Sequence, residues 1–370
     1  MSSEIYRRSR KENFPSSLEL TIGKKTFKFV KEHFLSEGKE FHLRYGDNPH
    51  QSSAVYHLAH DIDEVMVGKG LLYDKMFFND MTWKKMGKDG PSKTNIQDGY
   101  NGLNIVSLFK NPAASVMKHL NPCGVAFAKP SEEISKAFEQ AWNSDERSSY
   151  GGTVCLNRPL NSSTAELFIG KYIECVFAPG CDNEALNILQ KKENLRIASS
   201  PSLDRLKENP FPFELISVGD GLILQEPYST GVYDLAVLRT KQVPTKRVPN
   251  ESEYRDLFYA WQVSGWVRSN GIVIWKKNKA IGIGTGHQDR IGSIEDAIRR
   301  AERNQHDLNG SALASDGFLP SVDNIDAIAS KGIKSVIQPG GSNQDSNIIK
   351  IANENDISMI FTGERSFRHF

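Results

Sequence analysis

Short β-rich runs alternate with helical patterns twice along the chain, and this alternation constrains the fold more than any other feature of the sequence. Runs of branched and apolar residues predict strands, and apolar residues spaced three or four apart predict helices. In the first half the predicted strands are 102–108, 113–117, 153–156 and 175–178, and the predicted helices are 132–143 and 163–171.

The same order returns in the second half. A long amphipathic helix is predicted at 251–267, and a hairpin follows with strands at 271–275 and 280–283 around a Lys-Lys-Asn-Lys turn. Ser293 is interpreted as the N-cap of a helix that runs to Ala301, with acidic residues in its first turn. The remaining predicted strands are 312–314, 335–337 and 359–361, and the remaining predicted helices are 323–331 and 346–355. Strands interleaved with helices predict layered α/β domains, two of related design.

The length of 370 residues exceeds the usual size of one hydrophobic core and also favours two domains. The segment 199–212 contains three prolines and several charges, so it is the best candidate linker. We therefore expect a first domain at 43–200 and a second at 201–370. Residues 1–42 are expected to form an N-terminal arm, either with a helix at 25–35 or as a segment that packs on a dimer.

The bulk composition argues against several classes of protein. A formal net charge of +1 leaves no excess of lysine and arginine for a nucleic-acid backbone. No apolar run approaches the roughly 18 residues that cross a bilayer, and no secretory signal follows the basic N-terminus. The four cysteines form no CxxC pair, which is typical of reduced thiols in a cytosolic protein. The sequence predicts a soluble cytoplasmic protein that binds neither nucleic acid nor membranes.

A lysine–histidine pair, Lys118 and His119, ends a predicted strand and is followed by the turn sequence Asn121-Pro122-Cys123-Gly124. Side chains at such a strand end lie at the rim of an α/β sheet, where ligands usually bind. The neighbouring ammonium should oppose protonation of the imidazole and keep it neutral, as a base requires near pH 7. Adjacent Lys-His pairs are common, so the pair alone does not establish a catalytic site.

Four further clusters are rich in glycine, arginine and amide groups. They are Arg44 to Gln51, Gly282 to Arg290, Gln338 to Ser342 and Arg365 to His369. Arginine suits phosphate or carboxylate recognition, and glycines ahead of a helix can present backbone amides to an anion. The glycine spacing at 282–286 does not fit a dinucleotide fingerprint. Taken singly, each cluster is better explained as a polar loop or an ordinary turn.

Two interpretations as metal sites are disfavoured. His57 and His60 have a usable spacing, but neighbouring carboxylates do not complete a recognised ligand set. The Pro122-Cys123 pair is similar to half of a zinc-deaminase motif, yet Ala126 stands where the second cysteine would be. We therefore expect no metal.

The order of these clusters resembles the transformylase portion of the bifunctional aminoimidazole carboxamide ribonucleotide (AICAR) transformylase/inosine monophosphate (IMP) cyclohydrolase family. The resemblance begins near Leu43, extends to the last residue and rests on the ordered set of motifs. The motifs are Arg44-Tyr45-Gly46 with Pro49-His50-Gln51, Lys118-His119 with Asn121-Pro122-Cys123-Gly124, Ser149-Tyr150-Gly151-Gly152 with Asn157-Arg158-Pro159, Phe177-Ala178-Pro179 with Glu184-Ala185-Leu186, Arg268-Ser269-Asn270, Gly282 to Gly286 with Arg290, Ala314-Ser315-Asp316 with Phe318, Gln338 to Ser342, and Phe361-Thr362-Gly363 with Arg365.

The resemblance implies an α/β fold of two cytidine-deaminase-like three-layer subdomains without zinc. It also implies a homodimer with active sites at the subunit interface. The bifunctional members of the family carry an N-terminal cyclohydrolase domain, whereas fewer than 45 residues precede the first motif here. The expectation is a free-standing transformylase, with ring closure left to a separate IMP cyclohydrolase.

The implied reaction moves a formyl group from 10-formyltetrahydrofolate to the 5-amino group of AICAR. By resemblance His119 is the base at the amine, Lys118 stabilises charge on the formyl oxygen or the departing folate nitrogen, and Asn270 orients the reacting groups. The implied nucleotide contacts are Arg44, Tyr45, Gly151, Glu174, Asn270, Arg290 and Arg365, and the implied folate contacts are Ile291, Phe318, Asp323, Ser342 and Asn343. Glu174 departs from the aspartate of the family, although a longer carboxylate could still reach a ribose hydroxyl.

Three alternatives remain open at this point: a catalytically silent homologue that binds purine nucleotides, formylation that uses formate and ATP, and a purely structural α/β protein. The intact set of Lys118, His119 and Asn270 argues against the first. The absence of a Walker-type loop from the sequence argues against the second. The third leaves five polar, turn-rich clusters without a role.

Overall fold

The computed structural model describes residues 14–36, 38–45, 51–59, 78, 81–200, 203 and 214–370. The chain forms two compact units, and each is built from two segments: Met1–Ser107 with Gly151–Pro227 in unit 1, and Leu108–Tyr150 with Tyr228–Phe370 in unit 2. These contact-defined units are discontinuous in sequence, unlike the expected domains at 43–200 and 201–370. The division into two such domains stays a prediction.

Unit 1 contains parallel strands that are flanked by helices. Its parallel strands are β9 (Gly152–Leu156), β10 (Ile173–Ala178) and β11 (Arg196–Ser199), with β6 (Thr82–Lys85) antiparallel to β11. Its helices are α2 (Lys93–Ser107), α5 (Ser162–Phe168) and α6 (Asn183–Leu189). Helix α2 packs on β9 and β10, and the ring of Phe177 lies 2.3 Å from the point that a Cβ on Gly99 would occupy. A glycine at that position therefore allows the close approach.

The predicted strand at 102–108 is wrong, because these residues belong to α2. A short apolar run around Leu103 and Ile105 fits either a buried strand or a buried helix, and only the packing decides between them. The predicted helix at 25–35 is also wrong. That segment contains β2 (Lys25–Lys31) and β3 (Phe34–Ser36), because its apolar residues alternate with a period of two.

Three small antiparallel sheets complete unit 1. They consist of β1 (Ser17–Ile22) with β2 and β5 (Tyr56–Leu58), of β3 with β4 (Lys39–Phe41), and of β12 (Glu214–Val218) with β13 (Gly221–Gln225). Of the candidate linker at 199–212, residues 199, 200 and 203 are described, and the others lie outside the described residues.

Unit 2 contains a seven-stranded mixed sheet with the order β18-β17-β16-β14-β15-β8-β7. Its strands are β7 (Ala113–Lys118), β8 (Asn121–Phe127), β14 (Ile272–Lys276), β15 (Lys279–Gly284), β16 (Ala312–Ser315), β17 (Ser335–Gln338) and β18 (Ser358–Phe361). The strands β16, β17 and β18 are parallel, and the other neighbours are antiparallel.

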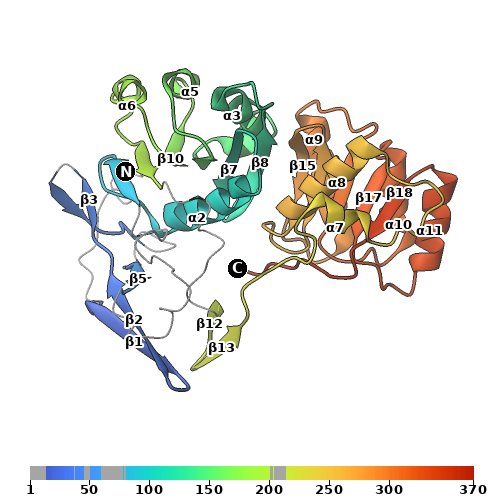
Figure 1. Ribbon diagram of the computed structural model, residues 1–370, viewed down its shortest axis with the longest axis horizontal. Coiled ribbons are helices and arrows are strands. Elements are labelled where there is room, and N and C mark those ends of the chain that lie inside the picture. Colours follow the sequence, from blue (N-terminus) through green and yellow to red (C-terminus); the bar gives the residue numbers. More distant parts are fainter. Residues whose placement is uncertain are drawn as a thin grey trace. The chain divides into compact units, whose positions relative to one another are not determined.

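Helices cover the sheet of unit 2 (Figure 1). They are α3 (Ile134–Trp142), α4 (Glu146–Ser149), α7 (Leu235–Arg239), α8 (Glu251–Ser264), α9 (Arg290–Arg303), α10 (Val322–Ser330) and α11 (Asp345–Glu354). Ile272 and Ile274 of β14 share a core cluster with α9, α10 and α11. The alternate residues Val273 and Trp275 are also fully buried, and α8 packs on β14, β16 and β17. The strands are therefore buried on both faces, as in a layered α/β arrangement.

The chain order of elements repeats, as the sequence predicts. Residues 113–199 and 272–361 each contain, in order, a hairpin, a helix, a strand, a helix, a strand, a helix and a strand. The first copy has one additional short helix, α4, before its third strand, β9. The two hairpins pack on their following helices through glycine. A Cβ on Gly124 of β8 would lie 1.9 Å from the carbonyl oxygen of Ala141, and one on Gly282 of β15 would lie 2.3 Å from that of Ala297.

Within the described part of the chain, no helix combines the length and the apolar character that a membrane span needs.

Candidate active site

His119 lies in a strained turn at the tip of the β7–β8 hairpin. Lys118 pairs with Asn121, so His119 and Leu120 alone connect the strands, and both have positive φ angles (56° and 68°). A two-residue loop with both residues in the left-handed region is the type I′ geometry that asparagine and glycine normally supply. The sequence predicts a turn at Asn121 to Gly124, directly after the observed one. This prediction is wrong, because those four residues form the beginning of β8.

The side chain of Lys118 extends to Tyr150, the last residue of the first segment of unit 2. Its Nζ donates a hydrogen bond to the carbonyl oxygen of Tyr150 at 2.7 Å. The neighbouring His119 is exposed at the hairpin tip. The two candidate catalytic side chains are therefore held differently: the ammonium is anchored, and the imidazole is open to a ligand.

Asn121 connects the hairpin tip to a second segment of unit 2. Its Oδ1 accepts hydrogen bonds from the backbone N–H of Arg268 and from the hydroxyl of Thr285, both at 2.8 Å. Its Nδ2 donates to the carbonyl oxygen of His119 at 3.0 Å. One amide side chain thus links the turn of His119 to the segment that leads into Asn270.

Asn270 is held by hydrogen bonds at both ends of its side chain. Its Oδ1 accepts from a guanidinium nitrogen of Arg290 at 2.7 Å, and its Nδ2 donates to the carbonyl oxygen of His287 at 3.0 Å. Its own carbonyl oxygen accepts a 2.7 Å hydrogen bond from the hydroxyl of Ser293. These contacts fix the direction of the amide.

Arg290 is the first residue of α9, and its guanidinium is almost fully buried. It forms an ion pair with Asp316, which is completely buried and also accepts a 2.6 Å hydrogen bond from Ser269. The Nε of Arg290 is buried without a hydrogen-bond partner in the described structure. The sequence places the N-cap of this helix at Ser293, which is wrong; the cap is Asp289, whose carboxylate accepts from the backbone N–H of Gly292 at 2.6 Å.

Several predicted ligand contacts follow the carboxyl ends of the parallel strands of unit 2. Phe318 comes after β16, Ser342 and Asn343 come after β17, and Arg365 comes after β18. The carboxyl ends of parallel strands meet at one edge of a sheet, where ligands bind in open α/β folds. Phe318 is 46% exposed, so its ring is accessible to a ligand.

The other predicted contacts of unit 2 lie near the same groups in sequence. Ile291 directly follows Arg290 in α9, and Asp323 is exposed in the first turn of α10. The guanidinium groups of Arg365 and Arg290 lie 4.7 Å and 5.9 Å from the centre of the same ring, that of Phe367. Because the charge of Arg290 is paired with Asp316, Arg365 is the cation of this pair that is left to meet an anion.

Four predicted nucleotide contacts belong to unit 1. They are Arg44, Tyr45, Gly151 and Glu174. The guanidinium of Arg44 lies 5.0 Å from the ring centre of Tyr45, and its Nε is buried without a partner among the described residues. Burial, and next the charge of Arg44, lower the pKa of the nearby Arg196. The two guanidinium groups of Arg44 and Arg196 therefore lie close enough to repel each other, and the carboxylate of Glu174 partly offsets this repulsion.

Gly151 and Glu174 are positioned by backbone and amide contacts. Gly151 has a φ of 76°, and its N–H donates to the carbonyl oxygen of Tyr172 at 2.8 Å. Glu174 accepts a 3.3 Å hydrogen bond from the amide of Asn95. Residues 46–50 of the first motif, and His60 of the disfavoured His57–His60 pair, lie outside the described residues.

No role is assigned from the sequence to Asn121, Asp316 or Thr285, although all three lie inside recognised motifs. The linking role of Asn121 could have been suspected from the sequence, because a polar residue beside a candidate catalytic pair is placed to hold it. The part played by Asp316 depends on its contact with Arg290, which only the folded chain reveals.

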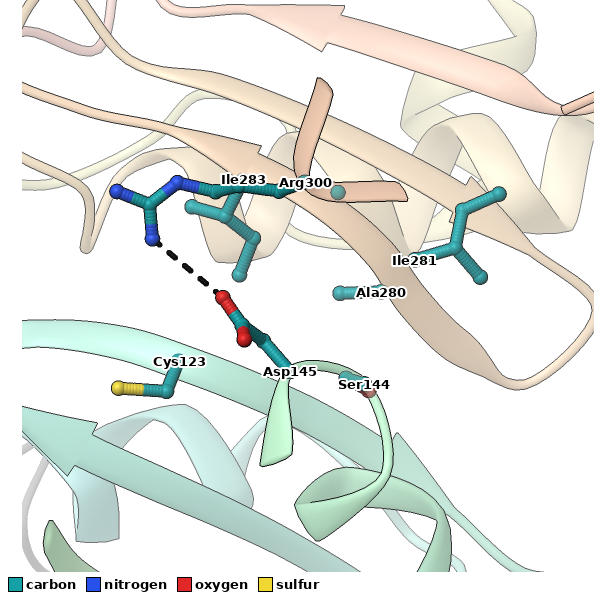
Figure 2. Close-up of a pocket in the computed structure, with 8 residues that line it drawn as sticks. Cys123, Ser144, Asp145, Ala280, Ile281, Ile283 and Arg300 are labelled. Carbon is teal, nitrogen blue, oxygen red and sulfur yellow. Dashed lines mark ion pairs between the residues drawn. The ribbon is translucent and has the colours of Figure 1, made fainter. Parts of the chain in front are cut away.

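A narrow pocket of unit 2 is lined by residues of β8, β15 and α9 and of the loop at 144–145 (Figure 2). Asp145 enters it with a nearly buried carboxylate, which lies 2.8 Å from Arg303 and 3.6 Å from Arg300. Cys123, the cysteine of the Pro-Cys pair, also lines this pocket, and its thiol donates to the carbonyl oxygen of Ser148 at 3.4 Å. The pocket is filled by a structural ion-pair network and offers little space for a ligand.

Comparison with known proteins adds a family match. The model of the family described as the AICARFT/IMPCHase bienzyme matches residues 11–300. The bifunctional purine biosynthesis protein PurH of Bacillus subtilis (strain 168) is 37% identical over 334 residues, which cover 90% of this chain and 59% of that protein. Proteins of the same name from Persephonella marina and Lysinibacillus sphaericus are 35% and 36% identical, and cover 92% and 97% of this chain. The chain spans about three fifths of the length of these relatives.

Proposed function

Because the chain belongs to the AICARFT/IMPCHase bienzyme family, we propose that it transfers a formyl group from 10-formyltetrahydrofolate to the 5-amino group of AICAR. The products are formyl-AICAR and tetrahydrofolate, and the reaction is a step of purine biosynthesis, the process named in the relatives. The observation that carries the proposal is the link made by Asn121, which ties the turn of His119 to the segment that leads into Asn270.

The chemistry explains why these groups belong together. The 5-amino group is conjugated with the imidazole ring and its carboxamide, so its lone pair is delocalised and it is a weak nucleophile. A base at the amine removes the proton as the bond to the formyl carbon forms, and His119 has the exposed imidazole for this step. The ammonium of Lys118 stabilises negative charge on the formyl oxygen or on the departing folate nitrogen.

Asn270 and the arginines position the substrates. The Oδ1 of Asn270 accepts one hydrogen bond from Arg290 and keeps a second lone pair for the N–H of the substrate amine, and the second N–H of its Nδ2 is left to donate to the formyl oxygen. Arg44, Tyr45, Gly151, Glu174, Arg290 and Arg365 are proposed to bind the nucleotide, and Ile291, Phe318, Asp323, Ser342 and Asn343 to contact the folate. The unpartnered Nε atoms of Arg44 and Arg290 support anion binding in both units.

We also propose that the two copies of the repeated element order are cytidine-deaminase-like subdomains. The matching hairpins, helices and parallel strands of 113–199 and 272–361 support this assignment. The proposed active form is a homodimer with its active sites at the subunit interface. The apolar hairpin β12–β13 supports it, because six large apolar side chains of that hairpin are exposed. A cytoplasmic location stays a prediction.

A direct assay tests the reaction. The purified protein is incubated with AICAR and 10-formyltetrahydrofolate, and the release of tetrahydrofolate and the appearance of formyl-AICAR are followed. We expect turnover in the wild type, and a loss of ~10²–10⁴-fold in kcat for His119→Ala with AICAR binding largely retained. Turnover of His119→Ala within a few fold of wild type would remove the mechanism.

The same assay separates the alternatives. Nucleotide binding without any turnover would identify a catalytically silent homologue. Formylation that requires formate and ATP, and proceeds without folate, would show that the formyl donor is not 10-formyltetrahydrofolate.

A further inference from the structure

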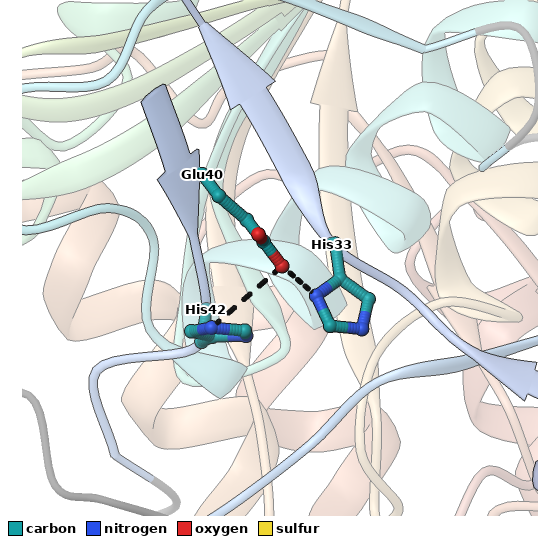
Figure 3. A group of neighbouring side chains, drawn as sticks. All are labelled: His33, Glu40 and His42. Atoms are coloured by element: carbon teal, nitrogen blue, oxygen red, sulfur yellow. Dashed lines mark hydrogen bonds and ion pairs between the residues drawn. The ribbon is translucent and has the colours of Figure 1, made fainter. Parts of the chain in front are cut away.

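Three side chains of metal-ligand type converge on one hairpin of unit 1. Phe34 pairs with Phe41 across β3 and β4, so the flanking residues His33 and His42 lie opposite each other. Glu40 precedes His42 by two residues. Residues that lie opposite, and residues two apart on one strand, project from the same face of a hairpin. His33, Glu40 and His42 therefore share a face, and Figure 3 shows their side chains directed at one another.

The distances suit a single ion. The candidate ligand atoms of the three residues all lie within 4.8 Å of one another. Glu40 Oε1 contacts His33 Nδ1 and lies 3.9 Å from His42 Nε2. The two imidazole rings have their centres 5.0 Å apart and are inclined by 71°, so they are not stacked. Ligands about 2.0–2.2 Å from a tetrahedral ion lie roughly 3–4 Å from one another, so small side-chain rotations would complete the geometry.

The opposite face of the hairpin is fixed by packing. Phe34 is 2% exposed and makes an edge-on contact with Trp83, with ring centres 5.5 Å apart. The hydroxyl of Ser36 donates to the carbonyl oxygen of Trp83 at 3.3 Å. The three candidate ligands, in contrast, are between two fifths and about half exposed. A fixed backbone with an open ligand face allows an ion to enter and leaves coordination positions for water.

We propose that His33, Glu40 and His42 bind a divalent transition-metal ion of the zinc class. Two imidazoles and one carboxylate suit Zn²⁺, Co²⁺ and Ni²⁺, whereas Ca²⁺ and Mg²⁺ prefer oxygen ligands. The ion joins the two strands at the open end of the hairpin, through His33 and His42. His42 also lies two residues before Arg44, so the ion restrains the segment that enters the proposed nucleotide site. The site does not depend on the proposed formyl transfer.

The test is titration of the full chain with Zn²⁺ by isothermal calorimetry. The ligand variant is Glu40→Gln combined with His42→Ala, and the matched control is Leu35→Ala, which changes an exposed apolar residue on the same face. All the altered side chains are exposed, so the variants should fold, and circular dichroism in the presence of a chelator checks this. We expect the wild type and the control to bind one equivalent of Zn²⁺ more than the ligand variant.

Co²⁺ provides a second readout. Its visible absorption reports nitrogen and oxygen ligands, and we expect bands in the wild type that the ligand variant loses. Equal Zn²⁺ stoichiometry and affinity in the wild type and the ligand variant would overturn the proposal. Absence of Zn²⁺ binding by the wild type at micromolar concentrations would overturn it as well.

Discussion

Asn121 joins the two segments that carry the proposed catalytic groups, so its removal tests positioning at the scale of a residue. Asn121→Ala loses all three hydrogen bonds, whereas Asn121→Asp keeps the acceptor for Arg268 and Thr285 and loses only the donor to His119. We expect Asn121→Ala to lower kcat by ~10–100-fold, because small misplacements of reacting groups are costly.

The readout is the separation of kcat from KM. A positioning role predicts little change in the KM for AICAR, and a smaller loss of kcat in Asn121→Asp than in Asn121→Ala. A parallel loss of thermal stability and of both kinetic constants would instead indicate that Asn121 only supports the fold.

A buried carboxylate makes a second prediction at this scale. Burial raises the pKa of Asp256 to about 7, partly offset by the 3.0 Å hydrogen bond that it accepts from the backbone N–H of Lys277. A raised pKa means that the folded state holds a proton which the unfolded state releases near pH 4. The associated stability is present below pH 4 and is lost as the pH rises to about 7.

Asp256→Asn keeps an acceptor for Lys277 and removes the charge. We expect the free energy of unfolding of the wild type to fall between pH 5 and pH 8 more steeply than that of the variant, by at most about 3 kcal/mol. Urea denaturation at these pH values measures the difference. Identical pH profiles would show that Asp256 is not protonated in the folded protein near neutral pH.

The sequence singles out candidate catalytic residues, whose role stays a prediction, but it does not predict their geometry. Lys118, His119 and Asn270 stand out through the order of motifs, which is a property of the chain itself. The left-handed turn at His119 and Leu120 could not be predicted, since neither residue type favours it and the following Asn-Pro-x-Gly sequence imitates a turn. The ion pair between Arg290 and Asp316 could not be predicted either, because it joins residues far apart in sequence.

At the scale of elements, the hairpin β12–β13 is the clearest surface for association. Ile216 and Ile223 pair across the two strands, and both are substantially exposed. An apolar, two-stranded hairpin is only marginally stable alone, and its open edges invite pairing with another chain. This element therefore supports the proposed homodimer.

Ile223→Glu places a charge in the middle of this surface. We expect it to weaken dimerisation by at least about tenfold, measured by sedimentation equilibrium at several protein concentrations. Leu18→Glu, on the separate β1–β2 hairpin, is the matched control because Leu18 is similarly exposed. An unchanged association constant in Ile223→Glu would remove this hairpin from the interface.

Element types are predictable where a regular pattern is long enough. The strands at 113–117, 153–156, 175–178, 312–314, 335–337 and 359–361, and the helices at 132–143, 163–171, 251–267, 323–331 and 346–355, are confirmed within a few residues. The strand predicted at 102–108 is wrong because no such regular pattern exists there. Its apolar run is too short to show a period, and burial of α2 against β9 and β10 decides the conformation.

At the scale of the whole molecule, the repeated order of elements is predictable and the composition of the units is not. Periodicity is local, so it reveals both copies of the hairpin, helix and strand series. The compact units combine residues from separate parts of the chain, for example Leu108–Tyr150 with Tyr228–Phe370. Such grouping depends on long-range packing that no local pattern encodes.

The repeat makes one matched prediction about packing. Gly124 of β8 and Gly282 of β15 occupy corresponding places in the two copies, each against the helix that follows its hairpin. A methyl group at either position would meet a helix carbonyl oxygen at 1.9 Å or 2.3 Å, so the helix must move away from the sheet. We expect Gly124→Ala and Gly282→Ala each to lower the free energy of unfolding by ~1–3 kcal/mol or more.

Gly180→Ala is the control, because the nearest atom to a Cβ at position 180 would be 3.6 Å away. Thermal denaturation measures all three variants, and a Gly124→Ala or Gly282→Ala protein as stable as the control would mean that the hairpins and helices of the two copies do not pack in the same way.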